Sequence, residues 1–565
     1  MDAKFPGRGA LVAGIRGKNF LNVDPLQFAA SHLEGHATTN QFGYEAPQLV
    51  SHRKSPNAGE VEPITARRCA PRKNSHAHCG KLCGYPVDIG SVPLRKTKLV
   101  ITFGPALLQG DRLREILCYA DTIRLNASHG DAASRSEALT LIRRTASELN
   151  RSVAVLLDLQ GPKWRVGLFE GTIPLAMDSM GAFYPMGQAE PSGVFAWKVP
   201  LPHPELFAGA KVGQHWLLDD GALEVEIVET EPDRLLAKVV VGGELKPRKG
   251  IHPIGLDVSL DPLTPKDMED IAWGVQHGVD LFAQSFVRRA SDVHQLHSLI
   301  KKHGGNQPII AKIEHPAALG NLEEILDVAW GVMVARGDLG VELGVERVPT
   351  LQKQIIEAAR ASLKPVITAT QMLESMLENP QPTRAESSDV ANAIWDGTDA
   401  VMLSAESATG KYPVEAVKWL DRIAAEADMA HRRRPLPQET LDRTTGRTEV
   451  AVAFAACKVA TELKARWIVA FTEGGSSARM VSRLAGSVSV LGATTDEVTA
   501  RRMGLLRGVT PLIIPRVQST DEMVETVRAL LQARQDLVAG DCVVMTMGLP
   551  LWKSGTTNTM KVMTF

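Results

Sequence analysis

The stretch PIIAKIEHPAALGNLEEILDVAWGVMVARGD, residues 308–338, begins and ends with a short apolar run, PIIAKIE and GVMVARGD. Both runs have the length and apolar character of a strand that is buried on both faces. Amphipathic helical stretches, such as DVHQLHSLIKKH and LQKQIIEAARASL, separate most runs of this kind along the chain. The other six runs lie at 99–105, 121–128, 153–160, 280–286, 365–371 and 400–406. Eight strand–helix units predict an α/β fold in which parallel strands close into a (β/α)8 TIM barrel.

Two further parts of the chain fall outside this alternation. More than a hundred residues separate the third strand from the fourth, which is too many for a single crossover helix. The alternating segments HWLLDDGALEVEIVE and RLLAKVVVGGELKP in this interval predict antiparallel strands. We therefore assign the catalytic barrel to 96–167 and 250–430, with a small inserted β domain at 168–249. A linker-like segment at 431–447 then opens a C-terminal α/β domain, 431–565, with strands ARWIVAFT, SVSVLGAT and DCVVMTMG.

The composition is that of an ordinary globular enzyme. The chain has 565 residues, of which 44% are hydrophobic and 22% charged, and a chain of this length should divide into several domains. Its formal net charge of -1 provides no field to recruit nucleic acid or an anionic membrane. No apolar run is long enough to span a bilayer, and six scattered cysteines suit a reducing compartment. We expect a cytoplasmic enzyme with neither nucleic acid nor membrane as a partner.

The first 95 residues differ from the rest of the chain. They are rich in Gly, Pro, Asn, His and Arg, and we expect this N-terminal extension to be largely irregular. The segment HAHCGKLCG places His76, His78, Cys79 and Cys83 close together, with Cys69 upstream. A zinc site is one interpretation, but the spacing matches no standard finger, and polar tail residues are the favoured one. A transit peptide, or a start codon assigned too far upstream, are further alternatives.

Polar side chains stand where the predicted strands end. The βα loops at that face of a barrel carry the catalytic groups, and residues two apart on a strand share a face. Any one of these residues could be a satisfied polar group at a strand end, but the whole set predicts a site. The set is Arg124, Asn126, Ser128, Asp158, Ser285, Lys312, Glu314, Asp338, Thr370 and Ser404.

The residue types in this set suit phosphoryl transfer. Glu314 and Asp338 lie one βα unit apart and offer hard oxygen ligands of the kind that hold Mg2+. Lys312 supplies a point charge for a phosphoryl group in transfer, and Arg124 suits a phosphate at rest. Gly337 leaves the backbone open beside Asp338 for close approach of a substrate. Phosphoryl transfer requires such metal ligands, cations and positioning, with little covalent help from the protein.

At the level of whole motifs, the chain resembles the pyruvate kinases. The resemblance implies transfer of the phosphoryl group of phosphoenolpyruvate to ADP in glycolysis, with Mg2+ or Mn2+, by a homotetramer. The matching motifs include KTKLVITFGPA, IRLNASHGD, LLDLQGPKWR, LLDDG, DLFAQSFVRRASDV, IIAKIEHP, VMVARGDLGVELG and KPVITATQMLESM, in the family's order from about 96 to 428.

Two other functions are compatible with this scaffold. A catalytically silent regulator that binds phosphometabolites on the same scaffold would be favoured by loss of Lys312, Glu314 or Asp338, and all three are present. A metal-dependent lyase acting on pyruvate-like enolates would not need the inserted domain or the nucleotide contacts.

The resemblance also assigns roles to residues. Glu314 and Asp338 would bind the divalent metal, Lys312 would stabilise the phosphoryl group in transfer, and Arg124 would bind the phosphate. Gly337 and Thr370 would hold the carboxylate end of the substrate, with Thr370 near the face where the enolate is protonated. Nucleotide contacts fall to Asn126, Arg165 and Lys249, and Asp220 would reach in from the inserted domain, which would act as a lid.

The segment DLQGPK, residues 158–163, departs from the family's usual Asp-Thr-Lys-Gly-Pro-Glu. Many pyruvate kinases need K+, which is held by groups that match Asn126, Ser128, Asp158 and the carbonyl of Leu159. Lys163 replaces the glutamate here, and a fixed ammonium can supply the positive charge of the cation. The chain resembles the K+-independent branch, so K+ is predicted not to be required. The alternative is an exposed Lys163 that is paired with a nearby acid.

Milder departures lie nearby. The segment after the inserted domain reads KGIHPIG, residues 249–255, rather than the common KGVNLPG, so the hinge differs. His315 follows the Lys312–Glu314 pair and is expected to have a structural role.

A second anion site is predicted in the C-terminal domain. The segment FTEGGSSARMVSR, residues 471–483, runs from a strand into a helix, where backbone N–H groups and the helix dipole favour an anion. By resemblance it would bind a phosphorylated sugar or AMP as activator, while the alternative is a helix N-terminus without a ligand. The residues proposed for this effector site are Thr472, Ser476, Ser477, Ser554 and Thr556.

Overall fold

The computed structural model describes residues 95–256, 261–430, 446–533, 537–553 and 555–565. The expectations for residues 1–94, including the zinc interpretation, lie outside the described residues, as do those for most of the 431–447 linker and for Ser554.

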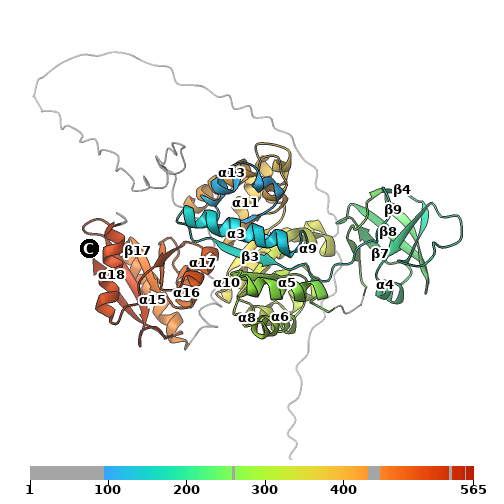
Figure 1. Ribbon diagram of the computed structural model, residues 1–565. Coiled ribbons are helices and arrows are strands. Elements are labelled where there is room, and N and C mark those ends of the chain that lie inside the picture. The colour runs from blue at the N-terminus through green and yellow to red at the C-terminus, as the bar shows by residue number, and fades with distance from the viewer. Residues whose placement is uncertain (1–94, 257–260, 431–445, 534–536, 554) are drawn as a thin grey trace, which may run out of the picture. The chain divides into compact units, whose positions relative to one another are not determined.

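Eight parallel strands close into a barrel in the order β1-β16-β15-β14-β13-β12-β3-β2 (Figure 1). Each coincides with one of the eight apolar runs, so the predicted TIM barrel is confirmed. The strands are β1 (Lys98–Thr102), β2 (Thr122–Asn126), β3 (Ala154–Asp158), β12 (Leu281–Gln284), β13 (Ile309–Ile313), β14 (Gly331–Ala335), β15 (Val366–Ala369) and β16 (Ala400–Leu403).

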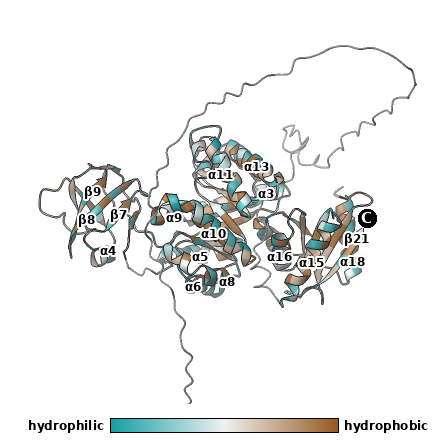
Figure 2. Ribbon diagram, turned by 180° about the vertical axis from the view of Figure 1, so that it is seen from behind, coloured by the Kyte–Doolittle hydropathy of each residue, from teal (hydrophilic) through white to brown (hydrophobic). Residues whose placement is uncertain are grey.

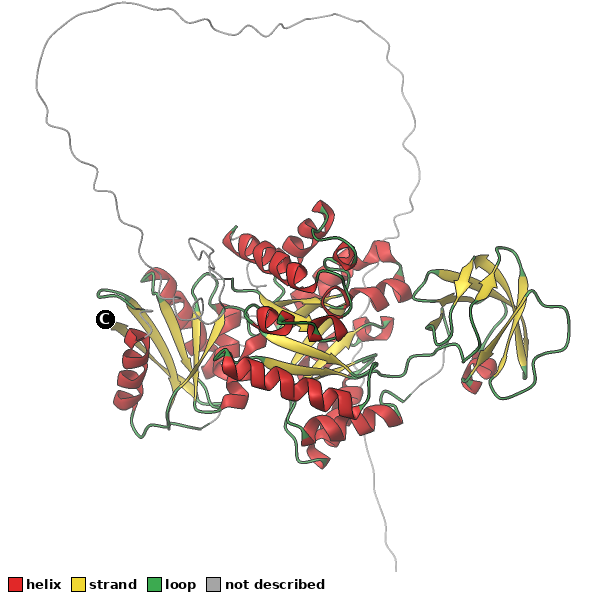
Figure 3. Cartoon of the chain, turned by 45° about the horizontal axis from the view of Figure 1, so that its top comes forward, coloured by secondary structure: helices red, strands yellow, loops and turns green. Residues whose placement is uncertain are grey.

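Helices surround these strands (Figure 3). Asp131, Thr264 and Thr383 each begin a helix with a capping box, in which side chain and backbone satisfy each other's free groups. The helical elements of the barrel are η1 (Pro105–Leu108), α2 (Arg112–Leu117), α3 (Ala132–Glu148), α5 (Pro265–Gln276), α6 (Ala290–Lys302), α7 (Pro316–Gly320), α8 (Leu322–Val328), α9 (Arg336–Leu343), η2 (Val345–Arg347), α10 (Val348–Ala361), η3 (Glu374–Leu377), α11 (Arg384–Asp396), α12 (Ala405–Ala408) and α13 (Pro413–Met429).

The barrel contains two layers of apolar side chains. One set, which includes Leu156, Ile310 and Met333, fills the inside of the barrel. A larger set, which includes Ile101, Leu157 and Phe282, packs between the strands and the helices. Burial on both faces explains why the strand sequences are almost continuously apolar, and they are coloured brown in Figure 2. The packed interior leaves the strand ends as the place for a site.

The inserted domain, coloured green in Figure 1, contains a six-stranded sheet in the order β11-β7-β8-β9-β5-β6 and the pair β10-β4. The predicted antiparallel segments form β7, β8 and β9, whereas β5 and β6 pair in parallel. Phe183, Trp197 and Trp216 pack together in its core. Its elements are β4 (Ile173–Leu175), β5 (Met180–Pro185), β6 (Trp197–Leu201), α4 (Pro204–Gly209), β7 (His215–Leu218), β8 (Leu223–Glu231), β9 (Arg234–Val241), β10 (Gly243–Leu245) and β11 (Ile251–Pro253).

The C-terminal domain is an α/β structure with the strand order β19-β18-β17-β20-β21. The three predicted strands are confirmed as β17, β18 and β20, and two unpredicted strands, β19 and β21, form the edges of the sheet. Its elements are α15 (Thr448–Glu462), β17 (Trp467–Phe471), α16 (Ser476–Leu484), β18 (Val490–Thr494), α17 (Glu497–Arg502), η4 (Met503–Leu505), β19 (Val509–Ile513), α18 (Thr520–Ala533), β20 (Cys542–Gly548) and β21 (Thr557–Thr564).

Within the described part of the chain, no helix combines the length and the apolar character that a membrane span needs.

Candidate active site

Lys312 is the central cation at the carboxyl-terminal mouth of the barrel. Its Nζ lies 2.8 Å from Glu314 Oε1 and 3.2 Å from Asp158 Oδ1, and it donates a hydrogen bond of 2.7 Å to Ser285 Oγ. Burial disfavours the charge of this lysine, but Asp158 and Glu314 outweigh the burial and hold its pKa above the usual value. The lysine is therefore a permanent ammonium with its three donors directed by the protein.

Arg124 is joined to Lys312 through a shared carboxylate. Arg124 Nε lies 2.7 Å from Asp158 Oδ2, and its guanidinium also donates to Thr102 Oγ1 at 3.1 Å. Asp158 is 1% exposed, yet Lys312 and Arg124 overcome the effect of its burial and hold its pKa below the usual range. One ionised, buried carboxylate thus fixes two cations beside each other, and an anionic substrate would meet both.

Glu314 and Asp338 are the two carboxylates of the predicted metal site. Glu314 is buried, and it accepts a hydrogen bond of 2.8 Å from the backbone N–H of Phe286. Burial raises the pKa of Glu314 and the nearby Asp338 carboxylate adds to the rise, while Lys312 opposes it. A divalent cation between the two carboxylates would relieve this repulsion, so the pair fits such a metal.

Two protein carboxylates leave most of the coordination to other ligands. Among the residues that the structure describes, no group of three or more His, Cys, Asp or Glu side chains is arranged to hold a metal ion. Mg2+ commonly uses one or two carboxylates with substrate oxygens and water, so the pair suits a metal shared with a substrate.

Gly337 and Asp338 belong to a helix rather than to a strand end. The run 331–338 had been assigned to a strand, but β14 ends at Ala335 and α9 begins at Arg336. The N–H of Gly337 donates a hydrogen bond of 2.9 Å to Thr370 Oγ1. Thr370 has a φ of +67°, a strained conformation for a β-branched residue. The surrounding structure thus holds this hydroxyl at the start of α9.

Lys163 contacts two acids. Its Nζ lies 3.0 Å from Asp220 of the inserted domain and 3.3 Å from Asp338. Its side chain is 18% exposed. Burial works against the charge, but Asp338 and Asp220 raise the pKa of Lys163 above its ordinary value. The lysine is thus paired with acids, and one of them is a predicted metal ligand.

The groups predicted for a monovalent cation make protein contacts of their own. Asn126 Oδ1 accepts from the N–H of Ser128 at 3.1 Å, and the carbonyl of Leu159 accepts from Ser285 Oγ at 2.7 Å. Asp158 is bound to Arg124 and Lys312.

The predicted nucleotide contacts Arg165 and Lys249 lie on the hinge of the inserted domain. Arg165 forms a bridge with Gly250 and donates to the carbonyl of Arg248 at 3.0 Å. Lys249 lies 2.5 Å from Asp219. In the described ranges, no hydrogen bond or ion pair joins Arg165 or Lys249 to Arg124 or Lys312. The structure therefore brings these two residues to the hinge but not into direct contact with the barrel site.

A large groove next to Arg124 was not found from the sequence. It has a volume of about 970 Å3 and is lined mainly by apolar groups. His129, which also lines the groove, directly follows the Arg124–Ser128 segment, and that adjacency was the available signal for its position at the site. The residues that line the groove include Pro105, Leu108, Arg124, Asn126, His129, Ala138, Leu141, Thr370 and Ser404.

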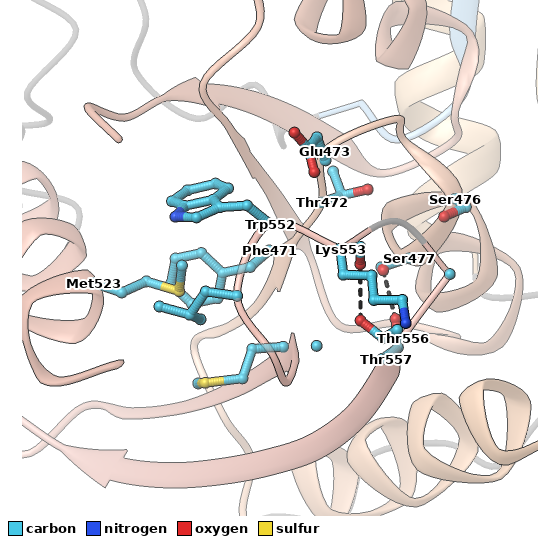
Figure 4. Close-up of a pocket in the computed structure, with 14 residues that line it drawn as sticks. Phe471, Thr472, Glu473, Ser476, Ser477, Met523, Trp552, Lys553, Thr556 and Thr557 are labelled. Atoms are coloured by element: carbon cyan, nitrogen blue, oxygen red, sulfur yellow. Dashed lines mark hydrogen bonds between the residues drawn. The ribbon is translucent and has the colours of Figure 1, made fainter. Parts of the chain in front are cut away.

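The predicted effector residues surround a small pocket in the C-terminal domain (Figure 4). Thr472, Ser476, Ser477 and Thr556 line it, together with Lys553 and Trp552. Ser477 and Thr557 share a hydrogen bond of 2.5 Å. Thr472 Oγ1 is buried without a hydrogen-bond partner among the described residues. The cavity is only about 30 Å3, which is too small to hold a sugar phosphate.

The fold and the mouth of the barrel define a class of protein. This is a (β/α)8-barrel protein with the cations Lys312 and Arg124 and the carboxylates Glu314 and Asp338 at the mouth of the barrel, and with a second domain inserted beside that site.

Comparison with known proteins identifies the family. Residues 94–417 match the family described as "Pyruvate kinase, barrel domain", and residues 450–563 match "Pyruvate kinase, alpha/beta domain". A pyruvate kinase of Agrobacterium vitis is 43% identical over 472 residues, which cover 83% of this chain and 98% of the relative. A pyruvate kinase of Geobacillus stearothermophilus is 42% identical over 475 residues, 83% of this chain and 80% of the relative.

The chain belongs to the pyruvate kinase family. It is a phosphotransferase enzyme that uses phosphoenolpyruvate and ADP and forms pyruvate and ATP, and its family uses a divalent metal. The comparisons give no support to the silent regulator considered above.

Proposed function

We propose that Lys312, Arg124 and Thr370 carry out the catalytic work of this chain. The observation that carries the proposal is the position of the Lys312 ammonium, which is buried between Asp158, Glu314 and Ser285. Lys312 stabilises the charge on the phosphoryl group as it moves from phosphoenolpyruvate to ADP, and Arg124 binds the phosphate before transfer. Both cations are held in place before the substrate arrives, so little reorganisation is needed during the reaction.

Glu314 and Asp338 are the proposed ligands of Mg2+ or Mn2+. Bound there, the cation would neutralise negative charge on the substrate oxygens. Glu314 is fixed by the Phe286 N–H and by Lys312, while Asp338 is fixed by the first turn of α9. The remaining ligands of the cation would come from the substrate and from water.

The start of α9 is the proposed binding place for the carboxylate end of phosphoenolpyruvate. Gly337 and Asp338 lie in its first turn, where the helix dipole favours an anion. Thr370 Oγ1 is held by the Gly337 N–H, and its hydroxyl is the proposed neighbour of the enolate when that carbon is protonated. Gly337 has room beside Thr370, because a Cβ at this position would lie 3.6 Å from Thr370 Oγ1.

The groove of about 970 Å3 is the proposed site for ADP. Its apolar walls suit a base and ribose, and Asn126 and the phosphate-binding Arg124 both line it. Arg165 and Lys249 would reach the nucleotide phosphates only when the inserted domain moves toward the barrel. That movement would also exclude water from a phosphoryl group in transfer.

Lys163 is the proposed replacement for K+. Its ammonium forms ion pairs with Asp338 and Asp220. The chain itself therefore supplies a positive charge beside the proposed metal ligand. A monovalent cation brought into this neighbourhood would meet that charge and be repelled.

Three further assignments concern activation, assembly and location. The Thr472–Ser477 segment and Thr556 form the proposed activator site for a phosphorylated sugar or AMP, supported by the unpartnered hydroxyl of Thr472 in its pocket. A homotetramer is proposed, and the outer strand β21 exposes Met560 and Val562 at a sheet edge, which is a typical surface for pairing with a second copy. The cytoplasm is the proposed location, on the composition of the chain.

A substitution at Lys312 tests the proposed function. Lys312→Met should reduce kcat for pyruvate formation by about a thousandfold or more, because the developing charge loses its nearest cation. Lys312→Arg keeps the charge and protects the fold against an uncompensated Asp158–Glu314 pair, and it should still be strongly impaired. Lys302→Met, on the exposed end of α6, is the matched control and should be fully active. Normal activity in both Lys312 variants would contradict the proposal.

A further inference from the structure

The two segments of the hinge each direct a basic side chain to the same helix of the barrel. Lys163, on the segment that follows β3 and leaves the barrel, lies 3.3 Å from Asp338. His252, on the returning strand β11, places Nδ1 3.5 Å from Glu342 Oε1. Asp338 and Glu342 are four residues apart on α9 and therefore share one face of it. The face of α9 that carries a proposed metal ligand is thus the face that the hinge contacts.

His252 belongs to the inserted domain, whose sheet continues beyond the boundary at residue 249 that the sequence predicts. It lies on β11, which pairs with β7 in the sheet of that domain, with His252 opposite Leu217. The turn that follows β7 also approaches α9, since a Cβ at Gly221 would lie 3.9 Å from Val341. The inserted domain itself, and not only its connecting segments, therefore meets α9.

The surroundings of Glu342 favour a specific pairing with His252. His252 is 5% exposed, and Glu342 is the only acid among the residues that line a cavity of about 340 Å3 at this junction. His315 from the β13–α7 loop also lines this cavity and interacts electrostatically with Glu342. Glu342 therefore lies between a histidine of the inserted domain and the residue that follows the proposed metal ligand Glu314.

We propose that His252 is a positioning residue which, through Glu342, docks the inserted domain on α9 and so fixes the metal ligand Asp338 and the N–H of Gly337. The proposal rests on the role given above to Asp338. It accounts for a second departure of this sequence, since His252 stands in KGIHPIG where an asparagine is common. Lys163 and His252 would act as two adjacent contacts on one helix, at its first and second turns.

A double-mutant cycle with a matched control tests this contact. The variants are His252→Ala, Glu342→Gln and their combination. The control is His215→Ala, because His215 pairs with Glu224 at 2.6 Å entirely within the inserted domain. Three quantities are measured on the full chain: Mn2+ affinity without substrates, KM and kcat for phosphoenolpyruvate, and hydrogen exchange of the peptides that cover 250–256 and 336–343.

Each single variant should weaken Mn2+ binding and raise KM by about fivefold to tenfold, with kcat changed less, as expected for loss of one contact. The double variant should be no worse than either single one, and exchange should increase in both peptides. The control should leave Mn2+ affinity and the 336–343 peptide unchanged.

Additive effects in the double variant, or unchanged Mn2+ affinity and exchange in His252→Ala, would overturn the proposal. An equal effect of His215→Ala would also overturn it, because the cause would then be general loosening of the inserted domain. Pyruvate formation by the unmodified chain is measured first. Its absence would contradict the proposed function, while the Mn2+ and exchange measurements would still decide on the contact.

Discussion

The ammonium of Lys163 lies 3.3 Å from the carboxylate of Asp338 and 3.0 Å from that of Asp220. A single side chain therefore joins the inserted domain to one of the two carboxylates proposed to hold the metal. A glutamate at position 163 would place a negative charge beside these two acids, and a cation would be needed to balance it. The proposed role of Lys163 therefore makes a prediction about the ion requirement of the enzyme.

The ion requirement can be tested directly. Pyruvate formation from phosphoenolpyruvate, ADP and Mg2+ should be nearly complete in buffer free of K+ and NH4+, and adding K+ should change it by less than about twofold. Lys163→Glu should lose most of its activity without K+, because the variant then places a third carboxylate beside Asp338 and Asp220. The control is Lys198→Glu, which breaks the ion pair of Lys198 with Glu190 within the inserted domain. Activity of the unmodified chain only with K+ would contradict the role given to Lys163.

Arg124 should contribute more to the binding of phosphoenolpyruvate than to the binding of ADP. Arg124→Gln should raise KM for phosphoenolpyruvate by about a hundredfold, in line with the loss of a charge-assisted phosphate contact, and KM for ADP should change much less. Steady-state kinetics with each substrate varied in turn will separate the two effects. Arg114→Gln, which breaks an exposed pair with Glu148, is the matched control. Equal changes in both KM values would show that Arg124 supports the structure of the whole site rather than binding phosphoenolpyruvate specifically.

The fold was predictable because buried barrel strands have a distinctive sequence pattern. All eight barrel strands coincide with apolar runs, and the polar side chains at or just after the ends of most of these runs pointed to Lys312, Glu314 and Arg124. Strand β21 was missed because its sequence, TNTMKVMT, is mostly polar and exposed at a sheet edge. Strand β19 was missed because a proline interrupts its apolar residues.

Contacts that depend on tertiary structure could not be predicted. The assignment of Asp338 to a strand was wrong because β14 passes into α9 without a loop, so no turn residue marks the boundary. The contact of His252 with Glu342 joins residues 90 positions apart on two domains, and no local pattern encodes it. The direction of the Lys163 side chain depends equally on where the inserted domain places Asp220.

The pocket of the C-terminal domain gives a prediction about activation. If Thr472 Oγ1 is the unsatisfied group that receives the activator phosphate, Thr472→Val should raise the activator concentration for half-maximal effect about tenfold. The measurement is activation by glucose 6-phosphate and, separately, by AMP at low phosphoenolpyruvate. Thr510→Val on strand β19 is the control. An unchanged response in Thr472→Val would favour the simpler interpretation of this segment as a helix N-terminus without a ligand.

Lys364 predicts how stability changes with pH. Burial lowers its pKa to about 8, Arg479 and Arg447 add to the effect, and Asp327 opposes it. Because the folded pKa is lower than the unfolded one, the unfolded chain binds more protons between about pH 8 and 10.5. The charged lysine therefore destabilises the fold most below pH 8, and this cost fades as the pH rises.

Lys364→Met should raise Tm relative to the unmodified chain at pH 7, and the difference should shrink toward pH 10. Lys302→Met, exposed on α6, should show no such trend. The Tm difference between Lys364→Met and the unmodified chain could instead stay constant from pH 7 to 10. That result would show that the effect of Lys364 on stability comes from its hydrogen bond to the Ala329 carbonyl rather than from its charge.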